Sequence, residues 1–212
     1  MKTVRFVLAF LVLILFVVFP TTALLCGTER WVVKVVRDKN AKVLFKNGSI
    51  TDKDLKKATE TTIAELVNMP KPKLSAQLAR QAGAESTIWT LEATLYDYAW
   101  EKPTRKKNEK TGKYVIVGDD DYHLAIRDGN QTMIAEIPNP TCVVNSPKLI
   151  QKLVKDARDK FDSELTATSG FQETNRRIRI TGPAFFDFKH GQRGYAKNGI
   201  EIHPILKIEF LN

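Results

Sequence analysis

The longest apolar stretch of the chain lies at its N-terminus. Residues 6–19 are all apolar and follow a short basic start, and Pro20 ends the run. The small residues 21–23 then lie at the spacing that a signal peptidase recognises. Because the run is shorter than the roughly 20 residues of a membrane-spanning helix, we expect a secretory signal over residues 1–23. An uncleaved membrane anchor and a lipid attached at Cys26 are the alternatives.

Apolar and polar residues alternate with a period of two in several later segments, which is the pattern of half-buried strands. The alternation predicts strands at residues 86–100, from about residue 175, and at 200–210, and two further strands are expected at 122–127 and 131–137. Asp128–Asn130 is a strong hairpin turn between two of them. A basic polar loop is expected over residues 102–113, before the short apolar segment 114–117. Residues 29–36 favour a short strand or an extended arm.

Helical spacing of apolar residues occurs in two segments. The first covers residues 52–68, with Thr51 as its expected N-cap. The second begins after Ser146, the expected N-cap, with Pro147 at the first helical position. Its apolar stripe consists of Leu149, Ile150, Leu153, Ala157 and Phe161.

The order of these elements is three strands, one helix and two strands. This is the order of the five-stranded OB barrel, which has its helix between strands three and four. We therefore expect a mainly β fold with helices (α+β), an OB-like barrel with an N-terminal helical or extended arm. The predicted division is a signal peptide at 1–23, the arm at 24–84 and the barrel at 85–212. Another small α+β arrangement is the alternative.

The net charge indicates possible binding partners, and the cysteines indicate the cellular compartment. The formal net charge is +9, and removal of Lys2 and Arg5 with the signal lowers it to +7. A basic surface attracts polyanions or anionic membranes, although such charge also serves solubility. Cys26 and Cys142 are the two cysteines, and in an oxidising compartment they are expected to form one disulfide. Two buried thiols are the alternative. The expected location is secreted or periplasmic.

The candidate chemistry rests on histidines and carboxylates. The candidate catalytic residues are His123, Glu136, His190, Glu201 and His203. A cluster of this kind can bind a divalent metal or transfer protons. No two of these histidines share a local metal-binding motif, so a structural network of histidines bonded to the loop backbone is the alternative. No cofactor is required by any motif, and a divalent metal is the one cofactor that these residue types allow.

Several polar residues are candidates for binding. Arg177 and Arg179 lie on a predicted strand and, with nearby aromatic residues, form a candidate face for single-stranded nucleic acid. Asp121 and Gln192 are the other two binding candidates. Three adjacent aspartates at residues 119–121 resemble a calcium ligand set, but they lack the alternating frame of a calcium loop.

Four segments carry a resemblance to a known family. They are residues 29–34 (ERWVVK), 120–124 (DDYHL), 132–138 (TMIAEIP) with Cys142, and 185–204 (FFDFKHGQRGYAKNGIEIHP). With them the chain resembles a family of exported bacterial proteins without an established activity. It departs from the family pattern at Val32 and Tyr195. The resemblance implies that one recurring polar set is shared, namely Asp121, His123, Glu136, His190, Gln192, Glu201 and His203.

Two functional hypotheses follow from these patterns. The first is an exported OB-like domain that acts as a binding module in the cell envelope or outside the cell, with a polyanion or a protein as its partner. The second is a secreted hydrolase of the phosphodiesterase or nuclease type that uses the His/carboxylate residues. A monomer is expected in both cases.

Overall fold

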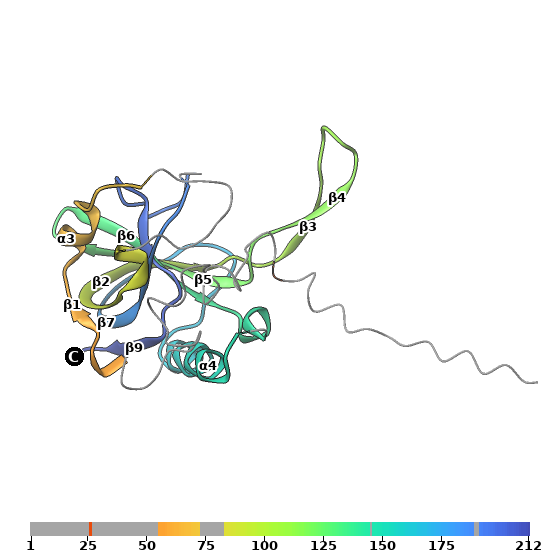
Figure 1. Cartoon of the computed structure of the whole chain (residues 1–212). Helices are drawn as coiled ribbons and strands as arrows, with labels where there is room; N and C mark the ends of the chain where they lie inside the picture. The colour runs from red at the N-terminus through yellow and green to blue at the C-terminus, as the bar shows by residue number, and fades with distance from the viewer. Residues whose placement is uncertain (1–25, 27–54, 73–82, 145, 189–190) are drawn as a thin grey trace, which may run out of the picture.

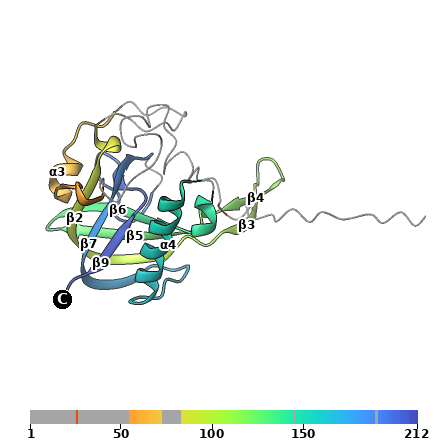
Figure 2. The same cartoon turned by 60° about the horizontal axis from the view of Figure 1, so that its bottom comes forward.

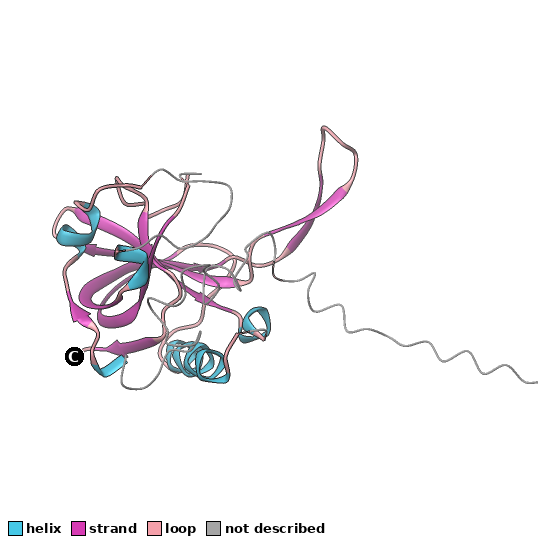
Figure 3. Cartoon of the chain, in the orientation of Figure 1, coloured by secondary structure: helices cyan, strands magenta, loops and turns pink. Residues whose placement is uncertain are grey.

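The computed structural model describes Cys26 and residues 55–72, 83–144, 146–188 and 191–212. Its strands are β1 Thr59–Glu60, β2 Ile88–Trp100, β3 Thr104–Lys107, β4 Tyr114–Val117, β5 Asp121–Asp128, β6 Gln131–Pro138, β7 Gln172–Phe186, β8 Ile200–Ile202 and β9 Lys207–Phe210. Its helices are α3 Ile63–Val67 and α4 Lys148–Asp162, with short 3-10 turns η3 Ala84–Ser86 and η4 Pro140–Val143. The described part is mainly β with few helices, as the sequence predicts (Figure 3).

One sheet of seven strands dominates the fold. Its order is β1-β2-β5-β6-β8-β7-β9, and β2 also pairs with β7. The pairings β2–β5–β6–β8–β7 therefore lead back to β2. Within this series β6 and β8 run parallel, whereas the other neighbours run antiparallel. Helix α4 connects β6 to β7, which is the predicted place for the helix.

The main core is formed by strands of the sheet together with buried residues of helices α3 and α4. Apolar residues of β2, β5, β6 and β7 meet there, and α4 packs against β9 and β6 (Figure 2). Phe161 of α4 is fully buried, with its ring centroid 5.5 Å from that of Tyr98, 5.0 Å from Tyr122 and 6.2 Å from Phe210. Burial of such a side chain stabilises the fold by about 1.5–3 kcal/mol.

The long strand β2 changes its inward-facing positions near its middle. Up to Leu95 the odd-numbered residues Leu91 and Ala93 are buried in the core, as the alternation predicts. The register with both neighbouring strands then shifts between Leu95 and Asp97. Such a bulge re-aims the side chains beyond it. As a result Tyr98 reaches the core, and the carboxylate of Asp97 becomes fully buried.

The prediction of one helix over residues 52–68 is wrong in the described part of that segment. Thr59–Glu60 forms strand β1, which pairs in parallel with β2. Helix α3 starts only at Ile63, because Thr62 and Glu65 form a capping box: the Glu65 N–H donates to the Thr62 hydroxyl, and the Thr62 N–H donates to the Glu65 carboxylate. The expected cap Thr51, the signal and the segment 29–36 lie outside the described residues. The buried residues of α3 belong to the main core.

Three further expectations need correction. Residues 102–113 are not all loop, because β3 pairs with β4 in a separate hairpin. The N-cap of α4 is Pro147 rather than Ser146, since the extended backbone of Pro147 delays the helix to Lys148. The single last strand is two strands: between β8 and β9, backbone N–H groups donate to the carbonyls of Pro183, Glu136 and Thr181. These bonds, and the missing N–H of Pro204, interrupt the ladder of hydrogen bonds that would otherwise join one continuous last strand to β7.

The predicted disulfide between Cys26 and Cys142 is confirmed. The two Cα atoms lie 5.5 Å apart, and the bridge spans 116 residues. It ties Cys26 to the turn η4 just before α4, where both cysteines adjoin a small second core. A sulfur in this bond is not available for lipid attachment. Within the described ranges, no helix has the length and apolar character needed to cross a membrane.

Candidate functional site

Two histidines approach one buried glutamate from opposite sides. Strands β5 and β6 pair His123 directly with Glu136. The Nδ1 atom of His123 lies 3.6 Å from Glu136 Oε1, and Nε2 of His203 forms an ion pair with Oε2. The side chains of all three are buried. Each carboxylate oxygen of Glu136 therefore faces one imidazole ring.

Glu201 completes this arrangement from strand β8. Its Oε1 atom lies 3.9 Å from His203 Nε2, and both side chains are buried. The ring of Phe185 lies 5.5 Å from the His203 ring and covers it. We call His123, Glu136, Glu201 and His203 the Glu136 cluster. Two buried carboxylates are costly unless a cation balances them, so the cluster needs protonated imidazole or a metal ion.

The donor atoms of the cluster are close enough to share one ion. One oxygen of Glu136, one of Glu201 and a ring nitrogen of His203 all lie within 4.8 Å of one another. Carboxylate oxygen and imidazole nitrogen are ligands for zinc and similar divalent ions. These residues could hold a metal as the sequence allows, and whether they do so stays a prediction.

The orientation of His123 is set by the loop between β7 and β8. Its Nε2 lies 2.7 Å from the carbonyl oxygen of Arg193. Its Nδ1 faces Glu136 and also Glu101 Oε1, at 3.5 Å. Burial by itself lowers the pKa of His123, but attraction to Glu136, the Arg193 carbonyl and Glu101 outweighs it. The pKa of His123 is therefore raised above its ordinary value of 6.5.

Arg193 is held in place by a buried acid and by close backbone packing. Its Nε lies 2.7 Å from Oδ2 of Asp97, the buried carboxylate next to the bulge in β2. Gly194, with φ +86°, lies against β5, and a Cβ added there would be 2.8 Å from the Cβ of Ala125. Only glycine fits this approach and this backbone conformation. The loop therefore presents the Arg193 carbonyl to His123 at a defined position.

A cleft of about 410 Å³ opens beside this site. Trp100, Lys102 and Lys106 line it together with Glu101 and Phe171. The edge of the Phe171 ring contacts His123, with ring centroids 5.5 Å apart. The Glu101 side chain is 34% exposed while it also faces His123. Glu101 thus connects the buried cluster to the open cleft.

The hairpin β3–β4 extends from the rim of this cleft away from the rest of the fold (Figure 1). Residues 102–117 contain six basic residues and one acid, Glu109. The guanidinium of Arg105 lies 4.2 Å from the ring centroid of Tyr114, which is 59% exposed. Basic and aromatic side chains therefore lie together on this arm.

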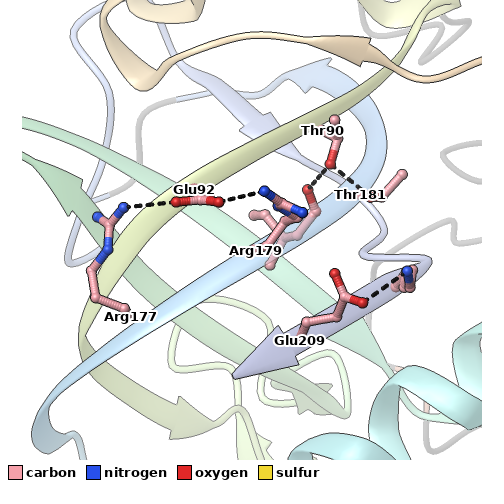
Figure 4. Close-up of polar contacts among 8 residues, drawn as sticks. Thr90, Glu92, Arg177, Arg179, Thr181 and Glu209 are labelled. Atoms are coloured by element: carbon pink, nitrogen blue, oxygen red, sulfur yellow. Dashed lines mark hydrogen bonds and ion pairs between the residues drawn. The ribbon is translucent and has the colours of Figure 1, made fainter. Parts of the chain in front are cut away.

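The predicted binding residues Arg177 and Arg179 lie at a different place, on the outer side of β7. Figure 4 shows both guanidinium groups turned toward Glu92 of β2, at 3.2 and 2.6 Å. Beside them the hydroxyl groups of Thr90 and Thr181 lie 3.0 Å apart. Thr90, Arg179 and Thr181 line a cleft of about 240 Å³ together with two lysines and two glutamates. The shared carboxylate of Glu92 reduces the attraction of the two arginines for an external anion.

The structure brings together four of the five predicted catalytic candidates, namely the members of the Glu136 cluster. His190, the fifth, lies outside the described residues. Gln192 is half-buried in the loop that carries Arg193. Asp121 is buried at the start of β5, opposite Pro138. In the acidic turn, the carboxylate of Asp120 accepts hydrogen bonds from Trp100 and Asn139, each at 2.9 Å, so this member of the triplet supports the fold.

Three residues of the site do not follow from the sequence patterns: Asp97, Glu101 and Arg193. Asp97 occupies an odd-numbered position of β2, which simple alternation assigns to the core, but after the bulge Tyr98 lies in the core and the buried carboxylate of Asp97 lies beside Arg193. Glu101 follows the end of β2, and Arg193 acts through its backbone carbonyl as well as its side chain. The signal that could identify Arg193 is its place between two glycines of the β7–β8 loop.

Comparison with known proteins gives a distant structural likeness. No protein-family model and no curated protein matches the chain. Among solved structures, a protein described as an aspartyl-tRNA synthetase of Leishmania major Friedlin matches 76% of the chain at 12% identity and a TM-score of 0.36. An asparaginyl-tRNA synthetase of Entamoeba histolytica, in complex with asparaginyl-adenylate, matches 73% at 14% identity and a TM-score of 0.35. The chain spans 22% and 24% of the lengths of these proteins.

Proposed function

We propose that the chain is an exported, OB-like binding module whose ligand is an extended polyanion. The observation that carries the proposal is the exposed arm around the hairpin β3–β4, where residues 102–117 contain six basic residues and one acid. Positive charge concentrated on a projecting element attracts a polyanion and releases its counterions on binding. If these charges served solubility only, substitutions on this arm and on other basic surfaces would weaken polyanion binding equally.

The strand pairings support the OB-like assignment. In an OB barrel, the loop between strands one and two and the loop between strands four and five flank the ligand face. Here the corresponding connections are the hairpin between β2 and β5 and the loop between β7 and β8. The cleft lies at the base of that hairpin, and Phe171 in its wall also contacts Arg193 of the second loop.

Aromatic side chains give the cleft a second means of binding. Trp100 and Phe171 line it, and Lys102 Nζ lies 5.5 Å from the Trp100 ring. Aromatic faces next to cations bind single-stranded nucleic acid by stacking as well as by charge. A polyanion that carries flat rings should therefore bind more tightly than one that carries charge alone.

The proposed location is outside the cytoplasm. The apolar run after a basic start supports export, and the Cys26–Cys142 disulfide is the kind of bond that persists in oxidising compartments. Both features are compatible with the periplasm and with the extracellular space.

The test compares two triple variants with the same loss of charge. Arg105, Lys106 and Lys107 of the hairpin are replaced by Gln in one. Lys152, Lys155 and Lys160 of α4, each of which pairs with an acid four residues further along the chain, are replaced by Gln in the other. Binding of a fluorescent oligothymidine and of inorganic polyphosphate is measured by anisotropy at several salt concentrations.

We expect the hairpin variant to bind oligothymidine at least about tenfold more weakly, and its slope of log affinity against log salt to fall by about two, while the α4 variant changes little. Oligothymidine should bind more tightly than polyphosphate because its bases stack. Equal losses in the two variants would show that only net charge matters, and the hairpin would then not be the binding element.

A phosphodiesterase is the second candidate function, and one observation favours it. His123 and His203 meet at Glu136, and Glu101 connects that cluster to the cleft. Its test is hydrolysis of a simple phosphodiester by the wild-type chain and by Glu136→Gln, with and without a chelator. No hydrolysis by the wild-type chain with added divalent metal would exclude this function.

A further inference from the structure

The cleft beside the Glu136 cluster combines three kinds of side chain. Trp100 and Phe171 supply aromatic rings, and Lys102 and Lys106 supply positive charge. Glu101 is the only acid among the described residues that line this cleft. The volume of about 410 Å³ lies within the range of about 300–1,000 Å³ that is usual for small-ligand pockets. The cleft is therefore large enough for one flat ring system of a ligand, with a single acid in its wall.

An acid in the wall of a basic cleft restricts which part of a polyanion can lie against it. A carboxylate accepts hydrogen bonds and donates none, and it repels phosphate groups. In single-stranded DNA the N–H donors lie on the edges of the bases. Glu101 is therefore suited to contact a base edge, whereas the lysines of the cleft are suited to contact the phosphate backbone.

The backbone at Glu101 is held in a defined position. Its N–H donates to the carbonyl oxygen of Asp121, and its own carbonyl oxygen accepts from the N–H of Asp120, each at 3.0 Å. Gly118, with φ +85°, packs against the same turn, where an added Cβ would lie 2.6 Å from the carbonyl oxygen of Lys102. Only glycine fits this approach and this backbone conformation. The position of Glu101 is thus fixed before any ligand arrives, as a residue that selects between ligands requires.

The carboxylate of Glu101 is oriented from behind and is open toward the cleft. Nδ1 of the buried His123 lies 3.5 Å from its Oε1 atom, whereas the Glu101 side chain is 34% exposed. A carboxylate has about four acceptor sites on its two oxygens, so the contact with His123 uses only part of this capacity. Both oxygens of Glu101 can therefore accept hydrogen bonds from the edge of one ligand.

The aromatic rings of the cleft can hold a base by its face. The indole N–H of Trp100 donates to Asp120 Oδ1 at 2.9 Å, which fixes the plane of the ring. The guanidinium of Arg193 lies 5.4 Å from the centroid of the Phe171 ring, and Phe171 is still 43% exposed. Stacking on such rings strengthens binding of every base and selects little among them. Selection therefore depends on the base edge, which Glu101 can contact.

The four DNA bases differ in the donors that they offer to a carboxylate. Guanine has two neighbouring N–H donors, at N1 and N2, which match the two carboxylate oxygens. Adenine and cytosine have an amino group beside a ring nitrogen that accepts, and thymine has one N–H between two carbonyl oxygens. In these three bases an acceptor faces the second carboxylate oxygen and is repelled by it. A good bidentate contact discriminates between bases by roughly 5–150-fold.

We propose that the cleft binds a guanine base of a single-stranded nucleic acid, with Glu101 accepting hydrogen bonds from N1–H and N2–H, and with Trp100 and Phe171 contacting the face of the base. This base preference rests on the proposed polyanion binding, because the basic hairpin at the rim of the cleft attracts the phosphate backbone. Phosphate contacts position a nucleic acid, and base contacts specify its sequence. The hairpin thus determines affinity, and Glu101 determines which base occupies the cleft.

The test uses the full chain and four short oligothymidines that differ only in one central base. This base is thymine, adenine, guanine or hypoxanthine, the base of inosine. Hypoxanthine is guanine without the N2 amino group, so this pair of oligonucleotides isolates the second of the two N–H donors. Anisotropy at one fixed salt concentration gives the four affinities. We expect the guanine oligonucleotide to bind at least about fivefold more tightly than each of the other three.

Two variants make the same chemical change at different places. Glu101 lies in the wall of the cleft, and Glu109 is an exposed acid between β3 and β4. A Gln side chain can still pair with N1–H and the neighbouring carbonyl, which guanine and hypoxanthine share, but it cannot accept from N1–H and N2–H together. Glu101→Gln should therefore bind these two oligonucleotides equally, whereas Glu109→Gln should keep the preference for guanine. Circular dichroism checks that both variants fold.

The outcomes separate this proposal from the one on which it rests. If the wild-type chain binds oligothymidine but does not prefer guanine, the base proposal is overturned and polyanion binding is kept. A preference for guanine over hypoxanthine that survives in Glu101→Gln would overturn the assignment of Glu101. If none of the four oligonucleotides binds, binding of single-stranded nucleic acid fails, and the base proposal fails with it.

Discussion

The hairpin β3–β4 and the Glu136 cluster use charged residues in opposite ways. On the hairpin, like charges are exposed and face water, so water and salt screen them. In the cluster, opposite charges are buried and face one another. Exposed charge contributes little to the stability of the fold but remains available to an external ligand. Buried charge is important for stability and becomes available only where, as at Glu101, a side chain reaches the cleft.

The largest expected effect comes from removing the shared partner of the cluster. Glu136→Ala leaves His123 and His203 buried without their common carboxylate, and removal of one partner of a buried pair costs about 3–5 kcal/mol. Urea unfolding followed by fluorescence measures the loss. The control, Glu109→Ala on the hairpin, should change the free energy of unfolding by less than about 0.5 kcal/mol. Similar losses of unfolding free energy in both variants would show that the buried and the exposed charges contribute equally to stability.

An intermediate loss of stability is expected when the ion pair between the buried Asp97 and the half-exposed Arg193 is broken. Asp97 is fully buried, whereas the side chain of Arg193 is 48% exposed. Asp97→Ala removes a charge-assisted contact, at a cost of about 1–3 kcal/mol, but leaves an arginine that water can solvate. Hydrogen exchange at residues 191–196 should become faster because the loop loses its anchor. Unchanged exchange there would mean that packing at Gly194 alone holds the loop.

The smallest effect is expected at an exposed pair on the body of the fold. Hydrogen bonds from Lys160, and then from Arg176, lower the pKa of Glu164 below its ordinary value of 4.5. The ionised Glu164 therefore stabilises the fold at pH values above 4.5, and this stabilisation is lost as pH falls through the lowered pKa.

The measurement is the difference in unfolding free energy between the wild-type chain and Glu164→Gln across this pH range. We expect a small difference at neutral pH, which vanishes in acid. A difference that grows in acid would contradict the assigned sign.

The sequence predicts best the elements in which one face is buried. Strands β5 and β6 are predicted because apolar residues occupy their inner positions, such as Leu124 and Ile126, which pack in the core. It misses β3, whose four residues are all exposed and therefore show no alternation. It also merges β8 with β9, since the backbone bonds of His203 and Ile205 to other strands leave no trace in side-chain polarity.

The sequence predicts which residue types form the site, but it does not predict all the contacts between them. Histidine and glutamate in strands indicate His123 and Glu136 as candidates, and the β5–β6 hairpin register makes them neighbours. Glu101 and Asp97 are missed for a physical reason. A bulge puts Tyr98 rather than Asp97 into the core and leaves Asp97 beside Arg193, and the position of Glu101 depends on how the chain turns into the hairpin. Both the bulge and the turn depend on tertiary packing rather than on the local pattern of apolar and polar residues.

The contact between Gly194 and Ala125 has a consequence for protein engineering. At this point the two backbones approach so closely that neither residue leaves room for a larger side chain. Gly191 has a φ of +87°, which favours glycine, and the Arg193 side chain forms the ion pair with Asp97, so both of these positions also have to be kept. A library that varies the exposed positions 102 and 106 of the cleft wall while keeping 125, 191, 193 and 194 would therefore change the chemistry of the cleft and leave the carbonyl that orients His123 in place.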